Sequence, residues 1–331
     1  MVELTTGPRL LAVAPNPSVD RLVEVDLLRR GEIHRPVAVT VVPGGKGFNV
    51  GRVAATLGAA VTGAGLLGGH AGRWIEERLI AEGIVVAAAR RAGETRTCTS
   101  VHDRTDGSTT EFYESGEPIS LAEWAGLIAV IEASLKKGDV GLVTVSGSLP
   151  PGAPGDGLAQ ILEMVRSYGP PVAIDGHGPA LLGALALAPW LVKVNLAEAH
   201  VTLGEPSLGR SAADGATGQP VVAAALAVHG LLRAGAARAI VTAGTAGSVA
   251  GLENGTLIHV QTTTLGGYPV GSGDAFLAGL SVATLKGEDL RSAVIHGTAA
   301  AAASALMPGA GRLEASDVER LLKAIRITSV P

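Results

Sequence analysis

The chain has 331 residues, of which 47% are apolar, and a formal net charge of −4. This is enough for one large α/β domain, while the scattered charges exclude the basic surface of a nucleic-acid-binding protein and the cationic block of a membrane-surface protein. We therefore expect a small-molecule partner. The single cysteine, Cys98, indicates a reducing compartment, and no apolar run suits a signal sequence or a membrane span, so we expect a cytoplasmic protein.

Short, almost continuously apolar runs alternate with helical patterns. The runs lie at residues 9–14, 139–147, 171–176, 190–195 and 237–244. Continuous apolarity is typical of parallel strands covered on both faces. Between them, the stretch 120–138 carries a capping box at Ser120 and Glu123 and ends at Gly138. The alternation predicts an α/β fold with a central, mostly parallel sheet.

Two segments, 21–43 and 94–114, depart from this alternation. Both are rich in β-branched residues, and the second contains an Asp-Gly turn at 106–107. We expect them to form a small sheet that projects over the main one as a lid. The polar stretch 204–219 is expected to be a surface loop. Since no linker or repeat divides the chain, we treat 1–331 as a single domain.

The segment 63–68, GAGLLG, matches the pattern of dinucleotide-binding loops. Arg90 and Arg91 follow it roughly where an NADP enzyme binds the 2′-phosphate. A lone match is weak, and these glycines lie well inside the chain. An NADP-linked reductase is one alternative function.

A second glycine-rich turn, within residues 42–58, leads into a predicted helix with Asn49 in its first turn. Three glycines in four positions allow a ligand to approach the backbone, and free N–H groups at a helix start suit anionic groups. This is not a Walker A loop, because Lys46 is followed by Gly47. A packing turn with a solvated lysine explains the segment about equally well.

The stretch YPVGSGDAFLAGL, residues 268–280, places Asp274 behind two glycines and before a helix expected to begin near Ala275. The amides of residues 271–273 can form an anion hole that stabilises a transferring phosphoryl group while Asp274 accepts the proton of the attacking hydroxyl. An aspartate of ordinary pKa is a weak base, so orientation would be much of its contribution. The competing interpretation is a simple N-cap.

Six short motifs link these segments. They are APNPSVD (14–20), GGKGFN (44–49), TR (95–96), SGSLP (146–150), KVNLAE (193–198) and PVGSGD (269–274). In order and approximate spacing they resemble the PfkB, or ribokinase-like, carbohydrate kinases, and most closely the 1-phosphofructokinase and tagatose-6-phosphate kinase branch. The resemblance spans nearly the whole chain, and it also accounts for a glycine-rich segment at 63–68. It implies a ribokinase-like three-layer α/β/α domain with a small β-sheet lid.

The resemblance also implies roles for individual residues. The catalytic base would be Asp274, assisted by the amides of Gly271, Ser272 and Gly273. Sugar hydroxyls would be held by Asp20, Gly44, Gly45 and Asn49, with Ser148 nearby. The phosphate already on the acceptor would be bound by candidates among Arg35, Lys46 and Arg96. On the nucleotide side, Lys193 would approach the ATP phosphates. The pair of Asn195 and Glu198 would act on Mg²⁺ largely through water. The nucleotide-binding loop would contain Thr242, Gly244 and Gly247.

The presence of these cationic residues can also be explained without a bound phosphate. Arg35 and Lys46 can be solvated surface charges, and Arg96 can pair with Glu94 or Glu111 at little energetic gain. Arginine suits a phosphate best because its planar fork binds in a bidentate manner.

Several departures from the family pattern leave the acceptor and the nucleotide open. Val194, Ala243 and Tyr268 replace the usual residues on the nucleotide side. The predicted strand 108–113 contains Glu111 where some related phosphofructokinases have a second phosphate-binding arginine.

We therefore expect a Mg²⁺- and ATP-dependent kinase of a ketohexose phosphate, with fructose 1-phosphate, tagatose 6-phosphate and fructose 6-phosphate as candidate acceptors. We also expect a homodimer that pairs through the lid. A kinase of an unphosphorylated sugar or nucleoside is an alternative. A non-catalytic ligand-binding regulator is another, against which the retained Asp274 argues.

Overall fold

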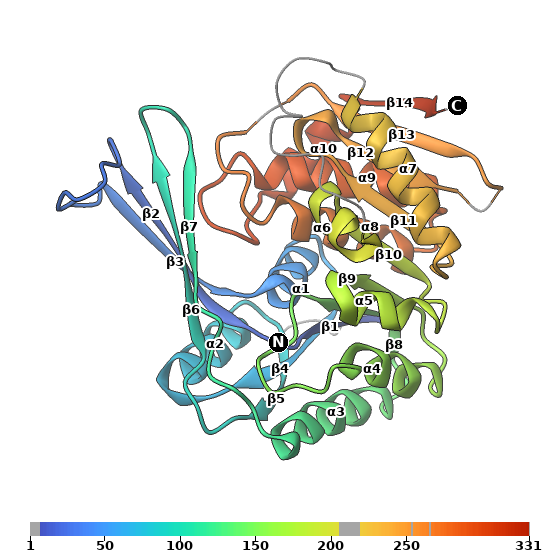
Figure 1. Ribbon diagram of the computed structural model, residues 1–331, viewed down its shortest axis with the longest axis horizontal. Coiled ribbons are helices and arrows are strands. Elements are labelled where there is room, and N and C mark those ends of the chain that lie inside the picture. The colour runs from blue at the N-terminus through green and yellow to red at the C-terminus, as the bar shows by residue number, and fades with distance from the viewer. Residues whose placement is uncertain (1–6, 205–218, 253, 265, 331) are drawn as a thin grey trace.

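A sheet of ten strands crosses the computed structural model (Figure 1), which describes residues 7–204, 219–252, 254–264 and 266–330. From one edge to the other the strands are β14 (Ile325–Val330), β13 (Leu257–Thr262), β12 (Ser248–Gly251), β11 (Ala239–Thr242), β10 (Leu191–Asn195), β9 (Val172–Asp175), β8 (Val140–Ser146), β1 (Arg9–Ala14), β4 (Val61–Leu67) and β5 (Val85–Arg90). Neighbours from β11 to β5 are parallel, whereas β12, β13 and β14 are antiparallel additions. The predicted mostly parallel sheet is confirmed, and all five apolar runs lie in it.

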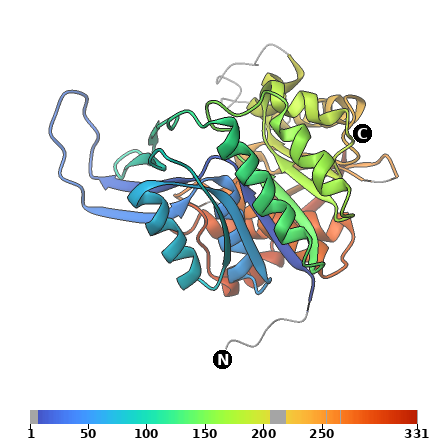
Figure 2. The ribbon, with the colours of Figure 1, turned by 90° about the horizontal axis from the view of Figure 1, so that it is seen from below.

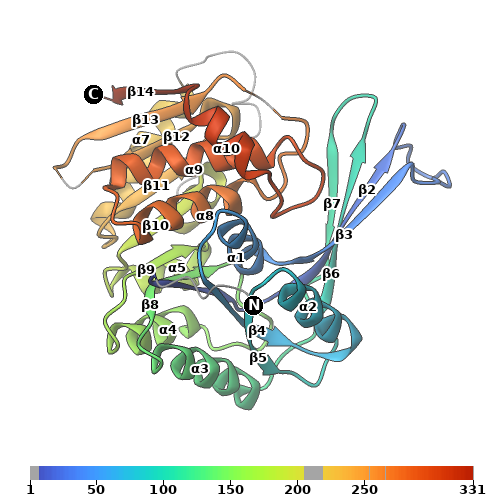
Figure 3. The same ribbon diagram turned by 180° about the vertical axis from the view of Figure 1, so that it is seen from behind.

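Helices cover both faces of this sheet. One face, in front in Figure 3, carries α1 (Lys46–Thr56), α2 (Gly69–Ala81), α8 (Ser272–Leu285), α9 (Leu290–Ser304) and α10 (Ala315–Leu322). The other, in front in Figure 1, carries α3 (Leu121–Leu135), α4 (Gly157–Arg166), α5 (Gly178–Leu185), α6 (Leu196–Leu203) and α7 (Gln219–Arg233). Successive residues of β1 point to opposite faces, so Leu10 joins one buried cluster and Leu11 the other. The three-layer α/β/α architecture is confirmed.

A local sequence signal accounts for the start of α3. The predicted capping box forms at the start of α3, where the hydroxyl of Ser120 accepts from the Glu123 amide and the Glu123 carboxylate accepts from the Ser120 amide. Most of the predicted loop at 204–219 lies outside the described residues.

Within the described ranges, none of the helices combines the length and apolarity that crossing a bilayer requires.

The dinucleotide-loop interpretation of residues 63–68 is wrong. Residues 63–67 lie inside β4, and the ring of Phe48 packs directly against them. A Cβ added at Gly65 would lie 2.7 Å from Cζ of Phe48. These glycines therefore serve helix–sheet packing, and no turn is present there to hold a pyrophosphate.

A separate four-stranded sheet forms the lid, in the order β3 (Ala38–Gly44), β2 (Ser18–Val25), β6 (Arg96–Asp103) and β7 (Thr109–Tyr113). Its strands come from the two segments predicted for it, with β2 beginning three residues earlier than expected. The β2–β3 hairpin projects far from the main body (Figure 2). One face of the lid, which carries Asp20, Cys98 and Glu111 and is called the inner face, lines a cavity together with residues at or just after the carboxyl ends of β1, β8, β10 and β11.

Candidate active site

A cavity of about 700 Å³ lies between the lid and the carboxyl ends of the parallel strands. Polar residues follow neighbouring strands at this edge, with Asn16 after β1, Ser148 after β8, and Asn195 and Thr242 at the ends of β10 and β11. Open α/β sheets bind ligands at this edge because loops and helix N-termini converge there. The cavity is therefore the candidate active site.

Asp274 enters this cavity from the first turn of α8. The helix begins at Ser272, earlier than predicted, and its N-cap is Gly271 with φ of 84°. Because Gly271 occupies the N-cap, the interpretation of Asp274 as an N-cap is wrong. The left-handed backbone at this position suits glycine, and a Cβ there would lie 2.8 Å from Ala310.

The backbone at the start of α8 offers amides to the cavity. The Ser272 amide donates to the Pro269 carbonyl at 3.2 Å. Among the described residues, no acceptor is found for the amides of Gly271 and Gly273, and the buried hydroxyl of Ser272 is also unpartnered. Two free amides and a hydroxyl at the positive end of a helix can bind an anion.

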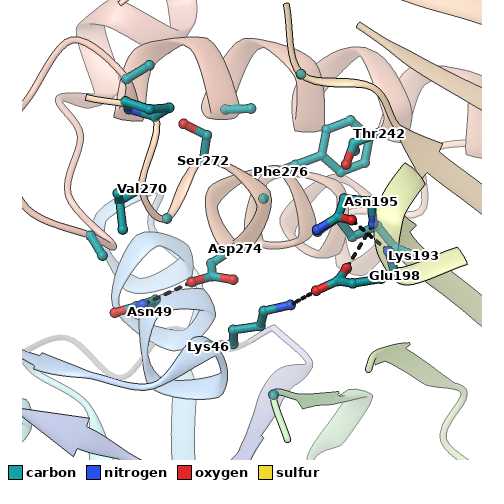
Figure 4. Close-up of a pocket in the computed structure, with 18 of the residues that line it drawn as sticks. Lys46, Asn49, Lys193, Asn195, Glu198, Thr242, Val270, Ser272, Asp274 and Phe276 are labelled. Carbon is teal, nitrogen blue, oxygen red and sulfur yellow. Dashed lines mark hydrogen bonds and ion pairs between the residues drawn. The ribbon is translucent and has the colours of Figure 1, made fainter. Parts of the chain in front are cut away.

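The environment of Asp274 changes its acid–base chemistry. Its side chain is only 5% exposed, and its Oδ2 accepts a hydrogen bond of 2.9 Å from Nδ2 of Asn49 (Figure 4). Burial and, to a lesser extent, the nearby carboxylate of Asp175 together raise the pKa of the Asp274 carboxyl to about 7, against the opposing effect of two lysines. A base with a pKa near neutrality accepts a proton more readily than the ordinary aspartate expected from the sequence.

Two lysines and two carboxylates form a network beside Asp274. Lys46 Nζ lies 2.8 Å from Asp175 and 2.6 Å from Glu198, and Lys193 Nζ lies 2.6 Å from Asp175. Asp175 and Lys193 are buried, and although burial raises the pKa of Asp175, the lysines outweigh it and lower that pKa to about 2. Both lysines are thus paired with carboxylates, and the predicted role of Lys46 at an acceptor phosphate, like that of Lys193 at the ATP phosphates, stays a prediction.

Lys193 also lies beside the amides of α8. A Cβ added at Gly273 would lie 2.8 Å from Lys193 Nζ. A side chain at this position would displace the ammonium group. The ammonium, which is paired with Asp175, and the start of α8 therefore lie at one point of the cavity.

Asn195 and Glu198 are joined by a capping box at the start of α6. The Asn195 side chain accepts from the Glu198 amide at 2.9 Å, and Glu198 Oε2 accepts from the Asn195 amide at 2.9 Å. Glu198 Oε1 faces Lys46 in the cavity (Figure 4). Across the described ranges, no group of three or more His, Cys, Asp or Glu residues is arranged to bind a metal ion.

The loop after β11 closes the far end of the cavity. Thr242 ends the strand, Gly244–Ala246 form a 3₁₀ turn, and Gly247 has φ of 89°. His259 supports this loop from β13, where its Nε2 lies 2.6 Å from the Ala246 carbonyl oxygen. No local pattern in the sequence indicated His259, although the β12–β13 hairpin that brings it there joins residues only 13 positions apart.

Asp20 lies at the lid end of the cavity. Its carboxylate accepts from the Ser18 hydroxyl at 2.6 Å and from the Gly45 amide at 3.4 Å. Burial raises the pKa of Asp20, and these hydrogen bonds oppose the effect. Gly44 does not line the cavity, but a Cβ there would lie 2.0 Å from Asp20 Cγ, so glycine makes room for the carboxylate.

Arg96 is the cation at the lid end. Its guanidinium donates to the carbonyls of Glu114 at 2.7 Å and Asn16 at 3.0 Å, and its buried Nε has no partner within the described residues. Pairing with Glu94 or Glu111 is not observed, since Glu94 accepts from the Ala71 amide and Glu111 from the Tyr113 hydroxyl. Arg96 therefore retains donors for a ligand.

Arg35 is not brought into the cavity. It lies exposed in the loop between β2 and β3, at the projecting end of the lid. Like His259, Asn16 and Asp175 were overlooked in the sequence, although Asn16 lines the cavity and Asp175 supports it. For Asp175 the available signal was an acidic residue at the carboxyl end of a buried parallel strand.

Comparison with known proteins agrees with this geometry. The sequence model of the pfkB family carbohydrate kinases matches residues 14–316. Phosphofructokinase-2 from Escherichia coli, in complex with potassium, has a TM-score of 0.81 at 25% identity, with 96% of this chain and 99% of that chain covered. A possible 1-phosphofructokinase from Thermotoga maritima has a TM-score of 0.83 at 20% identity, with 98% and 100% covered. Arabidopsis thaliana ribokinase, complexed with ribose and ATP, has a TM-score of 0.71 at 21% identity, with 96% and 99% covered.

These matches test the resemblance inferred from the six motifs. The structural similarities establish the fold along nearly the whole chain, and the family model covers most of it. The ribokinase-like fold and the sugar kinase activity expected from the motifs are confirmed. The chain belongs to the PfkB family of carbohydrate kinases.

Proposed function

We propose that the chain is a single-domain, ATP-dependent kinase that transfers the γ-phosphoryl group to a primary hydroxyl of a ketohexose phosphate. The observation that carries this proposal is the pairing of a buried carboxyl, Asp274, with free amides at the start of α8. The carboxylate would accept the proton of the attacking hydroxyl, and the amides of Gly271 and Gly273 would stabilise charge on the phosphoryl group. The free thiol of Cys98 fits a cytoplasmic enzyme.

The nucleotide would lie between the α8 amides and the loop after β11. Lys193 would contact its phosphates, and Gly244 and Gly247 would let the nucleotide approach the backbone. Both oxygens of Glu198 already have partners, so Glu198 fits a contact with Mg²⁺ through water better than direct ligation. Mg²⁺ binds in this manner when phosphates and water supply most of its ligands, and it would neutralise phosphate charge.

The acceptor would lie under the lid. Asp20 and Asn49 would bind its hydroxyls, and the remaining donors of Arg96 would bind its phosphate. A second candidate, an unphosphorylated sugar, is favoured by one observation: Glu111 places another carboxylate at the same end of the cavity. A carboxylate repels a phosphate and accepts hydrogen bonds from hydroxyls.

ADP release from purified protein with Mg-ATP tests the function, with fructose 1-phosphate, fructose 6-phosphate, tagatose 6-phosphate and free hexoses as acceptors. We expect turnover with one of the phosphates. Arg96→Ala should then raise KM for that phosphate at least about tenfold, because a charge-assisted hydrogen bond is lost, and leave ATP binding unchanged. Turnover of a free hexose that is indifferent to Arg96→Ala but sensitive to Glu111→Gln would select the second candidate.

We also propose that two copies pair through the outer face of the lid. Val39, Val41 and Phe112 are exposed on lid strands, at 46%, 39% and 60%. The register places Val23 opposite Val39 and Val101, so these apolar residues continue across the sheet on one face. A second lid would cover this face and the open strand edges. Val41→Asp should reduce the mass in sedimentation equilibrium from two chains to one, whereas a wild-type protein of one chain's mass would refute the pairing.

A further inference from the structure

Tyr268 reaches from the loop before α8 to the inner face of the lid. Its hydroxyl donates to Glu24 Oε1 at 2.9 Å, and its ring centroid lies 5.0 Å from that of His102, at an angle of 45°. Glu24 belongs to β2 and His102 to β6, and the two are paired in register on neighbouring strands. One side chain of the main body therefore contacts two strands of the lid.

The other side of this contact is fixed to the main body. The Tyr268 amide donates to the Ala305 carbonyl at 3.0 Å, just after α9 ends. Gly266 packs on the same residue, since a Cβ there would lie 2.0 Å from the Ala305 oxygen. The loop is thus held against α9 at two points and leads within three residues to Gly271.

The lid side of the contact belongs to the strands that carry acceptor-binding candidates. Asp20 precedes Glu24 on β2, and Arg96 precedes His102 on β6. A small cavity of about 20 Å³ lies beneath the lid, and Tyr268 lines it together with Val270 and Val42. The tyrosine side chain therefore lies between the lid and the loop before α8.

We propose that Tyr268 is a latch that holds the lid on the loop before α8, and that it thereby positions Asp20 and Arg96 relative to the amides of α8. This inference rests on the proposed function, because those residues must bind the acceptor for the latch to affect catalysis. The hydrogen bond from Tyr268 to the carboxylate of Glu24 is the stronger interaction of the latch, and the contact with the ring of His102 helps to orient the tyrosine ring. Tyr268 is a positioning residue and does not contact the reacting atoms.

A double-mutant cycle with Tyr268→Phe and Glu24→Ala tests the latch. Each single variant should raise KM for the acceptor by roughly fivefold, the loss expected for one hydrogen bond to a charged group near the surface, and should leave KM for ATP within about twofold. ATP hydrolysis without acceptor should rise relative to transfer, because a loosened lid admits water. The double variant should resemble either single variant, since both remove the same bond.

The chain offers a matched control. Tyr168 donates to Glu132 at 2.7 Å between α4 and α3, away from the lid, so Tyr168→Phe removes a bond of the same kind. It should leave acceptor KM unchanged. Additive effects in the cycle, or acceptor KM values for Tyr268→Phe that match those of Tyr168→Phe, would overturn the latch.

Hydrogen–deuterium exchange of the ligand-free protein separates the latch from the proposed function. Tyr268→Phe should speed exchange of the amides in β2 and β6 several-fold, and Tyr168→Phe should not, whatever the acceptor is. If no sugar phosphate is turned over but lid exchange rises, the latch stands and the acceptor assignment fails. If lid exchange is the same in both variants, the latch is refuted even when the acceptor assignment holds.

Discussion

Replacing Asp274 by asparagine should stabilise the protein at neutral and alkaline pH while it removes catalysis. The pKa of this buried carboxyl is raised from 3.8 to about 7. Between these pH values the folded protein retains a proton that the unfolded chain has released. The free energy of unfolding therefore falls as pH rises through this interval, because ionisation inside the fold is unfavourable.

The magnitude follows from the interval. About three pKa units at 1.36 kcal/mol each give a penalty of roughly 4 kcal/mol, complete above pH 7 and absent below pH 4. The amide side chain of the variant carries no charge and retains an oxygen that accepts the hydrogen bond from Asn49. The depressed pKa of Asp175 acts below pH 4, where its stabilisation is lost as pH falls towards 2, so it does not overlap this interval.

Thermal unfolding from pH 4 to pH 8.5, at constant ionic strength, measures the effect. Asp274→Asn should gain several degrees in Tm at pH 8 and almost nothing at pH 4. Its kcat should fall by about 100-fold or more. Asp317→Asn on α10 removes one negative charge far from the cavity and serves as the control. Wild-type and Asp274→Asn curves that run parallel over the whole range would refute a raised pKa.

Three further substitutions probe the cavity. Asp175→Asn removes a negative charge beside Asp274, so the acid limb of the pH profile of kcat/KM should move to lower pH, and an unmoved limb would contradict the coupling. Gly273→Ala should lower kcat by roughly 10- to 100-fold and should also lower Tm, because its methyl group displaces Lys193 from the buried carboxylate of Asp175. His259→Ala should raise KM for ATP a few-fold with acceptor KM constant, and equal changes in both would indicate general loosening.

Local sequence signals predicted much of this fold because they act over a few residues. Continuous apolar runs identified the parallel strands, and Ser120 with Glu123 identified the start of α3. The position of Asp274 in the cavity followed from the glycines that precede it. The prediction of the start of α8 near Ala275 was less accurate, because Gly271 takes a left-handed backbone as the N-cap and Ser272 already belongs to the helix.

The partners of Asp175 could not be predicted in the same way. Lys193 belongs to the neighbouring strand β10, while Lys46 comes from a helix 129 residues earlier in the chain. Both contacts depend on how strands and helices pack, and neither is encoded in the residues around Asp175. The raised pKa of Asp274 also depends on packing, because it results from burial and from the carboxylate of Asp175, which is close in space but distant in the sequence.

The lysine–carboxylate network constrains how a nucleotide would enter. Lys46 and Lys193 are already neutralised by Asp175 and Glu198, and burial of a lone charge is costly. ATP phosphates that draw the lysines away would leave two carboxylates unpaired beside further negative charge. A divalent cation that arrives with the phosphates would supply the missing positive charge. On the proposed function, metal and nucleotide should therefore bind cooperatively, with each raising the affinity for the other.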